Sequence, residues 1–457
     1  MSQISRRSFI KQSAIATGGA ISIAATARAQ SLTSTQKRAS LKKPGDKLRM
    51  AVIGSGGRGA GNLSEFYNLG EEIVALCDVD QNQLNNSYNK VKERCGAAKK
   101  YTDFRELLAS EKDLDVVVVS TPDHMHATAA IAAMKGGSHV YVEKPLVRTV
   151  WEGRQFKKIA DELGVVSQMG NQGNGSPSHR RRIEVLQSGI LGRIDEVHMT
   201  TNRPIWPQAI NRPAGSDPVS ASLNWDLWLG VARERPYKSG VYHPFKWRGW
   251  FDFGTGAMGD MACHATSAFF RAFKLAEVLT VECVASTPRF PETYPMATTV
   301  KTVYRSDMQA EPITVYWYDG NSLPDPAVCP KVAAIFGNLG GQTIITERAI
   351  VRGDSLCWNN EEKFKGFAKD ERCSKVEESI PRVQSHHWEF TEAIRGGVKP
   401  LSHHDHSVPL TEGVLLGCIA QQVPGELQWD AKAMQFKNNA EANKLIHPFV
   451  RDGWSIT

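Results

Sequence analysis

Short apolar runs alternate with helix-like stretches from Leu48 onward. The runs predict five strands, which span residues 48–53, 72–77, 114–119, 138–142 and 165–168. Buried strands that alternate with helices are typical of a parallel, doubly wound sheet, because each parallel connection needs a crossover. The sequence therefore predicts an α/β domain over residues 48–169.

The pattern changes near residue 170, where longer strands separated by loops follow. They are predicted at residues 194–201, 277–284, 298–305 and 311–318, with two amphipathic helices near 385–396 and 409–421. This order predicts an α+β domain over residues 170–457 with a mainly antiparallel, open sheet. Residues 202–253 are rich in Pro, Trp and Gly and have little periodicity, which indicates a long functional loop.

The first 29 residues have the pattern of an export signal and are left out of the predicted fold. Arg6-Arg7 precede a weakly apolar stretch, and Ala27-Arg28-Ala29 offers small residues for cleavage, as in twin-arginine signals. A membrane anchor is the alternative, but the stretch is too short and too polar to cross about 30 Å of bilayer. We expect a periplasmic or secreted protein that uses the twin-arginine export machinery, with residues 30–47 as a linker or arm.

Net charge gives no support for a nucleic-acid partner. The formal charge of +7 includes four basic residues within the first 29, which contain no acid. Without them, 51 basic residues face 48 acidic ones, which leaves +3. A balance this small does not indicate a nucleic-acid binder. With 41% hydrophobic residues, the chain can build two ordinary cores.

The eight cysteines contain no C-x-x-C pair, so neither a zinc site nor a thioredoxin-like motif is indicated. In an oxidising compartment, Cys357 with Cys373 is the pair to test first for a disulfide. Most of the others are expected to be buried thiols.

Two clusters of charged and histidine residues are expected to have structural or solvent-exposed roles. The run His403-His404-Asp405-His406 has the composition of a metal site, but its place before a helix favours a structural role, and no metal is predicted. The run Arg180-Arg181-Arg182 is most simply a solvated helix face.

A glycine-rich turn follows the first predicted strand. Its residues are Gly54, Ser55, Gly56, Gly57, Arg58 and Gly59, and a helical stretch follows from about residue 61. In a G-x-G-x-x-G turn the first glycine allows the tight bend, the second lets a pyrophosphate approach the backbone, and the helix N-terminus supplies N–H groups. The context predicts a Rossmann dinucleotide site; a glycine-rich turn without a ligand is the alternative.

Asp78 stands at the end of the second strand, where a carboxylate can bond the adenosine ribose. Because this charge would repel a 2′-phosphate, it favours NAD over NADP. NADP stays an alternative, since a basic arm could fold back and reverse the preference. The cations of that arm are Lys37, Arg38, Lys42 and Lys43.

Three further motifs lie where open α/β sheets bind ligands or in the following domain. They are Thr121-Pro122 with His126, then Glu143-Lys144-Pro145, and a glycine-rich run, 253–260, that leads into a helix expected at 261–273 with Asp260 and His264 four residues apart. Together they resemble the Gfo/Idh/MocA family of glucose-fructose oxidoreductase and inositol dehydrogenase. The resemblance covers nearly the whole chain after the signal and implies an NAD(P)-dependent sugar oxidoreductase.

The resemblance implies that Lys144 lies beside the nicotinamide and the reacting hydroxyl. A lysine beside a positive nicotinamide should have a lowered pKa, so it can exchange a proton or bond the substrate oxygen. Glu143 is expected to support this turn and the nicotinamide ribose, and the Lys144–Pro145 bond is expected to be cis. An exposed strand-end lysine is the alternative.

In dehydrogenase members of the family, the histidine that matches His264 acts as general base, and the aspartate that matches Asp260 binds or orients substrate. Other members have tyrosine in place of the histidine. The dehydrogenase form is present here, so these roles are expected for both residues. A structural histidine on a helix is the alternative.

Further cofactor contacts are expected from Thr121, Pro122 and His126, and Asp123 is a candidate on similar terms to His126. Asn171 with Gln172 resembles the family segment that reaches the nicotinamide or substrate, and a plain turn is an equal alternative.

Arg248 and Trp250 are expected to bind substrate, since an aromatic face can stack on a sugar while charged groups bond its hydroxyls. Trp206, Trp225, Trp228 and Trp247 belong to the same group. For most of these tryptophans, a place in the domain core is the alternative.

The sequence predicts reversible oxidation of a secondary hydroxyl on a sugar, glycoside or cyclitol, in which His264 takes the proton and Lys144 stabilises the oxyanion. Because no nucleotide pool exists outside the cytoplasm, the cofactor is expected to be tightly bound and recycled internally. It could be regenerated by two alternating sugars, by a separate acceptor, or by transient oxidation as in an NAD-dependent glycosidase branch that resembles this family. A non-catalytic sugar-binding relative is the alternative from another class. A homo-oligomer is implied by the resemblance alone.

Overall fold

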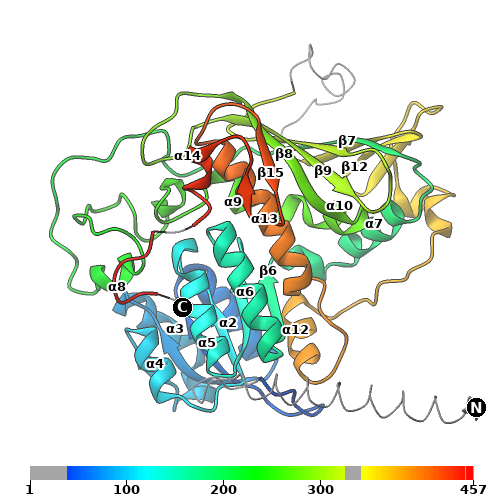
Figure 1. Ribbon diagram of the computed structural model, residues 1–457. Coiled ribbons are helices and arrows are strands. Elements are labelled where there is room, and N and C mark those ends of the chain that lie inside the picture. The colour runs from blue at the N-terminus through cyan, green and yellow to red at the C-terminus, as the bar shows by residue number, and fades with distance from the viewer. Residues whose placement is uncertain (1–38, 325–340, 448, 456–457) are drawn as a thin grey trace, which may run out of the picture.

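The computed structural model describes residues 39–324, 341–447 and 449–455. A six-stranded and a ten-stranded sheet organise them, with helices packed between and around the sheets (Figure 1). The predicted export signal lies outside the described residues. Within the described ranges, no helix combines the length and the apolar character needed to cross a membrane.

The first sheet is parallel and has the strand order β3-β2-β1-β4-β5-β6. Its strands are β1 (Arg49–Ile53), β2 (Glu72–Cys77), β3 (Lys99–Tyr101), β4 (Val116–Val119), β5 (His139–Glu143) and β6 (Ser167–Gly170). The connecting helices are α2 (Gly57–Asn68), α3 (Gln81–Cys95), α4 (Phe104–Ser110), α5 (His126–Lys135) and α6 (Val150–Leu163). The predicted doubly wound fold is confirmed. The apolar pattern missed the edge strand β3 because two of its three residues are exposed lysines.

Strand β4 explains how both faces of this sheet are buried. Val117 and Val119 face a core that includes α5 and α6, whereas Val116 and Val118 face a second core with α2 and α3. A strand buried on both faces is expected to be apolar throughout. The second core also contains Phe390 of the late helix α12 (His386–Ile394), so the parallel sheet is covered by both halves of the chain.

The second sheet is mixed, and only the β7–β10 pair among its neighbours is parallel. Its strands are β7 (Ile194–Thr200), β8 (Leu275–Ser286), β9 (Thr298–Ser306), β10 (Ile313–Tyr318), β11 (Gly341–Thr346), β12 (Ala349–Arg352), β13 (Ser355–Trp358), β14 (Lys365–Gly366), β15 (Leu427–Asp430) and β16 (Gln435–Phe436). Its helices are α7 (Pro177–Gln187), α8 (Trp225–Leu229), α9 (Gly256–Ala265), α10 (Ser267–Ala272), α13 (His404–Ala420) and α14 (Ala440–Asn443). The predicted mainly antiparallel sheet is confirmed.

Helix α13 joins the two halves, because it packs against α6 of the first sheet and β8 of the second (Figure 1). It begins at His404, five residues before the predicted start, since the His403 ring caps it. Helix α9 likewise begins earlier than predicted, at Gly256, and it ends at Ala265 before α10. Asp260 and His264 therefore both belong to α9.

The prediction of a solvated face at Arg180-Arg181-Arg182 is wrong. The Arg180 side chain is 1% exposed and pairs with Glu389 at 2.8 Å. Arg181 donates to the carbonyl of Val376 at 2.8 Å. These arginines tie residues 373–389 to α7, and nothing within the local charge pattern could indicate a partner so distant in sequence.

The disulfide suggested for Cys357 and Cys373 is absent, because both are free thiols. The Cys357 thiol donates to the carbonyl of Glu361 at 3.3 Å. Burial raises the pKa of the Cys373 thiol to about 12, so it behaves as a buried apolar group.

Candidate functional site

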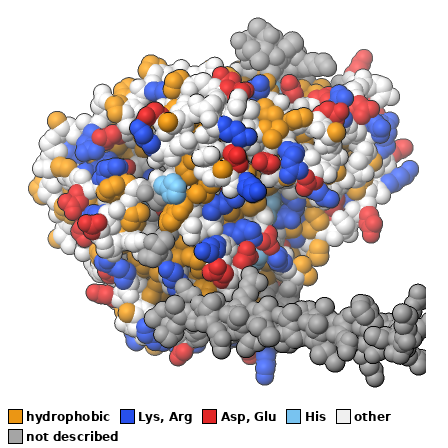
Figure 2. All heavy atoms as spheres, viewed as in Figure 1, with side chains coloured by type: hydrophobic (Ala, Val, Ile, Leu, Met, Phe, Trp, Pro, Cys, Tyr) orange, Lys and Arg blue, Asp and Glu red, His pale blue; other side chains and the backbone are white. Residues whose placement is uncertain are grey.

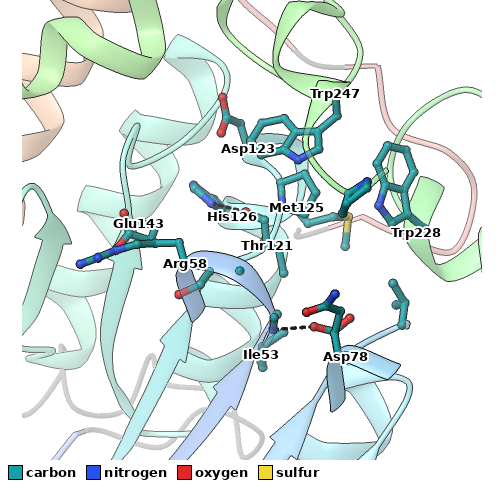
Figure 3. Close-up of a pocket in the computed structure, with 18 of the residues that line it drawn as sticks. Ile53, Arg58, Asp78, Thr121, Asp123, Met125, His126, Glu143, Trp228 and Trp247 are labelled. Carbon is teal, nitrogen blue, oxygen red and sulfur yellow. Dashed lines mark hydrogen bonds and ion pairs between the residues drawn. The ribbon is translucent and has the colours of Figure 1, made fainter. Parts of the chain in front are cut away.

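A cavity of about 720 Å³ lies at the carboxyl ends of β1, β2, β4 and β5 (Figure 3). The first sheet contributes predicted site residues to its lining, namely Gly54, Gly56, Gly57, Arg58, Asp78, Thr121, Pro122, His126, Glu143 and Lys144. The second half contributes Arg248, Asp260 and His264. Ser55, Gly59, Asn171 and Trp250 were also predicted site residues and do not line it. Most of the predicted site is therefore brought into one space.

The face of the molecule in view carries apolar and charged side chains side by side, with no broad field of a single charge (Figure 2). That surface agrees with the small net charge of the chain after its first 29 residues, in which 51 basic residues face 48 acidic ones.

The glycine turn has the close geometry that dinucleotide binding requires. Gly54 adopts φ +76°, and a methyl group on Gly59 would lie 1.8 Å from the Gly54 carbonyl oxygen. Gly59 therefore packs helix α2 onto the turn, although it does not face the cavity. The N–H of Gly56 donates to Asp78 Oδ2 at 2.9 Å, which fixes the turn against β2.

Asp78 is a buried carboxyl at the nucleotide end of the cavity (Figure 3). It also accepts the N–H of Asp80 at 3.0 Å. Burial raises its pKa, although the two N–H donors oppose that shift. These bonds orient the carboxyl at the position where this motif bonds a ribose.

The basic arm does not reach this end of the cavity in its described part. Lys42 pairs with Asp115 at 2.7 Å. Asp115 directly precedes β4, so this pair lies at the amino ends of the strands, whereas the cavity lies at their carboxyl ends. The Lys42 N–H donates to the carbonyl of Ile394. Lys37 and Arg38 lie outside the described residues. Lys42 is thus too far from Asp78 to offset the repulsion between that carboxylate and a 2′-phosphate.

The long loop 202–253 closes over the nucleotide end. The Asn224 N–H donates to the Val79 carbonyl at 2.9 Å, and the Gln81 N–H donates to the Ser222 carbonyl at 2.8 Å. These two bonds hold α8 over the end of β2, where Trp228 lines the cavity. The loop builds its own aromatic core, as expected for an ordered functional segment.

A residue from the end of the described chain completes this wall. Trp454 lines the cavity, lies 6.3 Å from the Phe104 ring and carries the Arg105 guanidinium at 4.2 Å. Arg451 anchors the same segment to α8 through an ion pair with Asp226 at 2.6 Å. The adenosine end is therefore enclosed by elements that do not belong to the first sheet.

At the other end of the cavity, one carboxylate joins two cations. Lys144 Nζ lies 2.6 Å from Asp260 Oδ1, and Arg248 Nε lies 3.2 Å from the same oxygen. The three side chains are between 14% and 20% exposed. Burial raises the pKa of Asp260, but Lys144 and Arg248 outweigh that effect and hold it below its usual range. Asp260 is therefore ionised and orients both cations.

His264 lies one turn after Asp260 on α9 and lines the same cavity. Burial, with the nearby charge of Lys144, lowers the His264 pKa to about 4. The imidazole is therefore neutral near pH 7 and can accept a proton from a substrate hydroxyl. The Lys144–Pro145 bond is cis, as expected.

Glu143 supports the turn that presents Lys144. Its Oε1 accepts bonds from Arg58 at 3.1 Å, Asn62 at 2.9 Å and Gln172 at 2.8 Å. Figure 3 shows the Arg58 and Glu143 side chains together on one wall of the cavity. The predicted structural role of Glu143 fits this network.

Two family models match the chain. The model for the oxidoreductase family, NAD-binding Rossmann fold, matches residues 48–171, and the model for the oxidoreductase family, C-terminal alpha/beta domain, matches residues 184–270. The chain belongs to the Gfo/Idh/MocA oxidoreductase family. The resemblance inferred from the motifs is thereby confirmed.

Curated relatives share one part of the chain. An alpha-N-acetylgalactosaminidase of Shewanella oneidensis is 31% identical over 207 residues, and a glycosyl hydrolase family 109 protein of Shewanella baltica is 30% identical over 207 residues. Each match covers 42% of this chain and 45% of the relative. The chain thus matches less than half the length of these relatives.

Solved structures share the fold over most of the chain. The WlbA dehydrogenase from Bordetella pertussis, in complex with NADH and UDP-GlcNAcA, has a TM-score of 0.58 at 18% identity and covers 85% of this chain and 99% of its own. Levoglucosan dehydrogenase in complex with NADH has a TM-score of 0.51 at 17% identity, with 82% and 97% covered. At these identities the likeness establishes a common fold.

Two residues of the Gfo/Idh/MocA motif after β4 act as supports in this chain. The ring nitrogens of His126 lie 2.8 Å from the Pro145 carbonyl and 2.9 Å from the Thr121 carbonyl, so the ring bridges two cavity turns. Asp123 accepts the Thr255 hydroxyl at 2.7 Å at the start of α9. Burial raises the Asp123 pKa. The motif therefore fixes α9 against the first sheet as well as lining the cavity.

Gln172, and not Asn171, reaches the cavity of this family member. Asn171 is buried, and its Oδ1 accepts the Ser402 hydroxyl at 2.6 Å. The expected cofactor contact of Asn171 is therefore wrong, because its side chain does not line the cavity, whereas that of Gln172 does. The side chains of adjacent residues in this turn point to opposite sides. The sequence alone does not tell which of the two sides faces the cavity.

The expectation that Trp250 binds substrate is also corrected. Its side chain is 0% exposed and packs at 5.0 Å against Tyr242 within the loop core. Trp228 and Trp247 do line the cavity. Phe245, which no motif indicated, also lines the cavity and is 41% exposed. No signal in the sequence marked Phe245, because the loop around it has no periodicity.

The histidine run at the start of α13 serves the fold. His404 Nε2 lies 3.0 Å from Asp161, and its other ring nitrogen lies 2.8 Å from the Ser167 hydroxyl. The ligand atoms of His403, His404 and Asp405 lie within 4.8 Å of one another, so their spacing would allow a metal ion. Lysines 157 and 399 pair with Asp405 at 2.8 and 2.6 Å, and these cations oppose a further positive charge.

Proposed function

We propose that this chain is an NAD-dependent oxidoreductase that acts on a secondary hydroxyl of a sugar or glycoside. The observation that carries the proposal is the shared cavity, in which the glycine turn and Asp78 lie at one end and Lys144, Asp260 and His264 at the other. A bound dinucleotide would place its adenosine at the first end and its nicotinamide at the second. The family membership and the NADH-bound fold relatives support this assignment.

The reaction divides between the nucleotide and the side chains. The nicotinamide, when bound, accepts the hydride. Neutral His264 takes the hydroxyl proton, and Lys144 donates a hydrogen bond to the oxygen as its charge develops. Asp260 fixes the Lys144 ammonium at 2.6 Å, so the donor is oriented before substrate arrives.

The nucleotide is proposed to be NAD, held tightly and recycled within each cycle. Asp78 disfavours a 2′-phosphate, and Lys42 pairs with Asp115 at the amino ends of the strands. Closure by α8 and Trp454 supports slow release. Export to the periplasm or the medium through the twin-arginine signal at Arg6-Arg7 is also part of the proposal. Outside the cytoplasm the enzyme would have no nucleotide pool, so a tightly held cofactor would be needed.

Glycoside cleavage through transient oxidation is the second candidate. The observation that favours it is the match to relatives named alpha-N-acetylgalactosaminidase and glycosyl hydrolase family 109 protein. In such a cycle the hydride returns to the sugar after the aglycone has left, so no net NADH accumulates. A tightly held nucleotide suits this cycle equally well.

One experiment separates the candidates. The purified protein is analysed by mass spectrometry for bound nucleotide and then mixed with a panel of sugars and 4-nitrophenyl glycosides. Lasting absorbance at 340 nm identifies a dehydrogenase, nitrophenol release without net NADH identifies a glycosidase, and neither signal over the whole panel contradicts both.

A matched pair of lysine variants tests the assigned site. Lys144→Ala should abolish turnover and keep the nucleotide, because it removes the donor but not the glycine turn. Lys158→Ala removes an exposed lysine on α6 and should change neither. Turnover retained in Lys144→Ala would contradict the mechanism.

A further inference from the structure

Phe245 is an exposed aromatic side chain at the edge of the cavity. It lines the cavity together with its neighbour Pro244, and the residue is 41% exposed. Ligand cavities are lined mainly by apolar and aromatic side chains, which pack against the bound ligand. The aromatic face is thus available to an incoming ligand.

Two neighbouring side chains hold the Phe245 ring in place. The Arg248 guanidinium lies 4.5 Å from the ring centroid, and Trp206 packs edge-on at 6.0 Å with an interplanar angle of 74°. Arg248 also donates to the Phe245 carbonyl at 3.1 Å. These contacts restrain the ring while the residue stays 41% exposed, so little further side-chain ordering is needed when a ligand binds.

Arg248 connects this ring directly to the proposed reaction centre. Its Nε lies 3.2 Å from Asp260, and Asp260 lies 2.6 Å from Lys144. One guanidinium group therefore separates the aromatic surface from the groups that would hold the reacting sugar. A ring joined to that sugar is the moiety that would reach Phe245.

We propose that Phe245 and Pro244 form a second subsite, which binds the aglycone of a glycoside or the next sugar ring of an oligosaccharide. The subsite rests on the proposed function, since it takes Lys144 and Asp260 as the place of the reacting sugar. It narrows the substrate class to compounds with a second ring. An aromatic side chain has the apolar body that packs against the C–H face of a sugar or an aryl group.

Equilibrium binding tests the subsite without any need for turnover. The nucleotide-loaded protein is titrated by calorimetry with 4-nitrophenyl α-N-acetylgalactosaminide and with free N-acetylgalactosamine, and other 4-nitrophenyl glycosides are paired with their parent sugars in the same way. The wild-type protein should bind the glycoside more tightly. Phe245→Ala should lower glycoside affinity about 2- to 13-fold, the range expected for one aromatic contact, and leave the free sugar unchanged.

Two control variants complete the test. Phe245→Trp should restore the preference for the glycoside, and Phe449→Ala, which removes a ring that is 43% exposed and outside the cavity lining, should have no effect. A preference that survives in Phe245→Ala, or a wild-type protein that binds no glycoside better than its parent sugar, overturns the subsite. A preference that depends on Phe245 in a protein without redox or cleavage activity supports the subsite and contradicts the proposed function.

Discussion

Gly59 offers the sharpest test of the nucleotide turn. A β-carbon there would lie 1.8 Å from the Gly54 carbonyl oxygen, and real β-carbons do not approach closer than 3.0 Å. Gly59→Ala therefore requires helix α2 and the turn to separate by about 1.2 Å, the difference between these two distances. Overpacking of this kind costs about 1–3 kcal/mol. Because the displaced atoms shape the pyrophosphate site, we expect the loss to fall on nucleotide binding.

The matched control is Gly61→Ala on the same helix. The nearest atom to its new β-carbon would be Arg58 Nη1 at 3.5 Å, an ordinary contact. A glycine-to-alanine change inside a helix without a clash is expected to stabilise the fold by about 0.5–1 kcal/mol. The two variants should therefore move the melting temperature in opposite directions.

NADH fluorescence titration and the nucleotide content after purification are the assays. A cost of 1–3 kcal/mol corresponds to an affinity loss of roughly 5- to 150-fold for Gly59→Ala. Gly61→Ala should bind as the wild type does. Equal nucleotide affinity in the two variants would refute the assignment of the turn as the pyrophosphate site.

Two further predictions concern charge. Asp260→Asn removes the carboxylate shared by Lys144 and Arg248 and should destabilise the fold by about 3–5 kcal/mol in urea denaturation while it abolishes turnover; an unchanged unfolding curve would contradict the ion-pair geometry. Burial lowers the pKa of both His124 and His387 from the ordinary 6.5 to about 3. Below pH 6.5 the unfolded chain therefore binds protons at these histidines that the folded chain does not bind. Stability present above pH 6.5 should thus fall progressively towards pH 3, and a melting temperature that stays constant from pH 7 to pH 4 would refute this.

Sequence reasoning succeeded where local pattern and chemistry coincide. Strand β4 is buried on both faces, so its four valines carry an unambiguous signal. The glycine turn and the lysine motif follow such strands, and the carboxyl ends of parallel strands meet at one edge. The part of the cavity lining that these motifs supply was therefore predictable from the order of residues alone.

It failed where a long-range partner decides the role. Arg180 looked solvated because its partner Glu389 lies 209 residues further on. Trp250 and Phe245 lie in a loop without periodicity, so nothing local indicated that the first is buried and the second exposed. The choice between Asn171 and Gln172 likewise depends on Ser402, which binds the first of them.

The contact between Trp454 and Phe104 also bears on when the nucleotide can be captured during protein synthesis. The glycine turn leaves the ribosome several hundred residues before Trp454 is made, so the nascent first domain exposes an adenosine site that lacks one wall. N-terminal domains generally fold first as the chain emerges. Firm capture of the nucleotide is therefore expected only after translation has passed residue 454, which makes cofactor loading a late step of maturation.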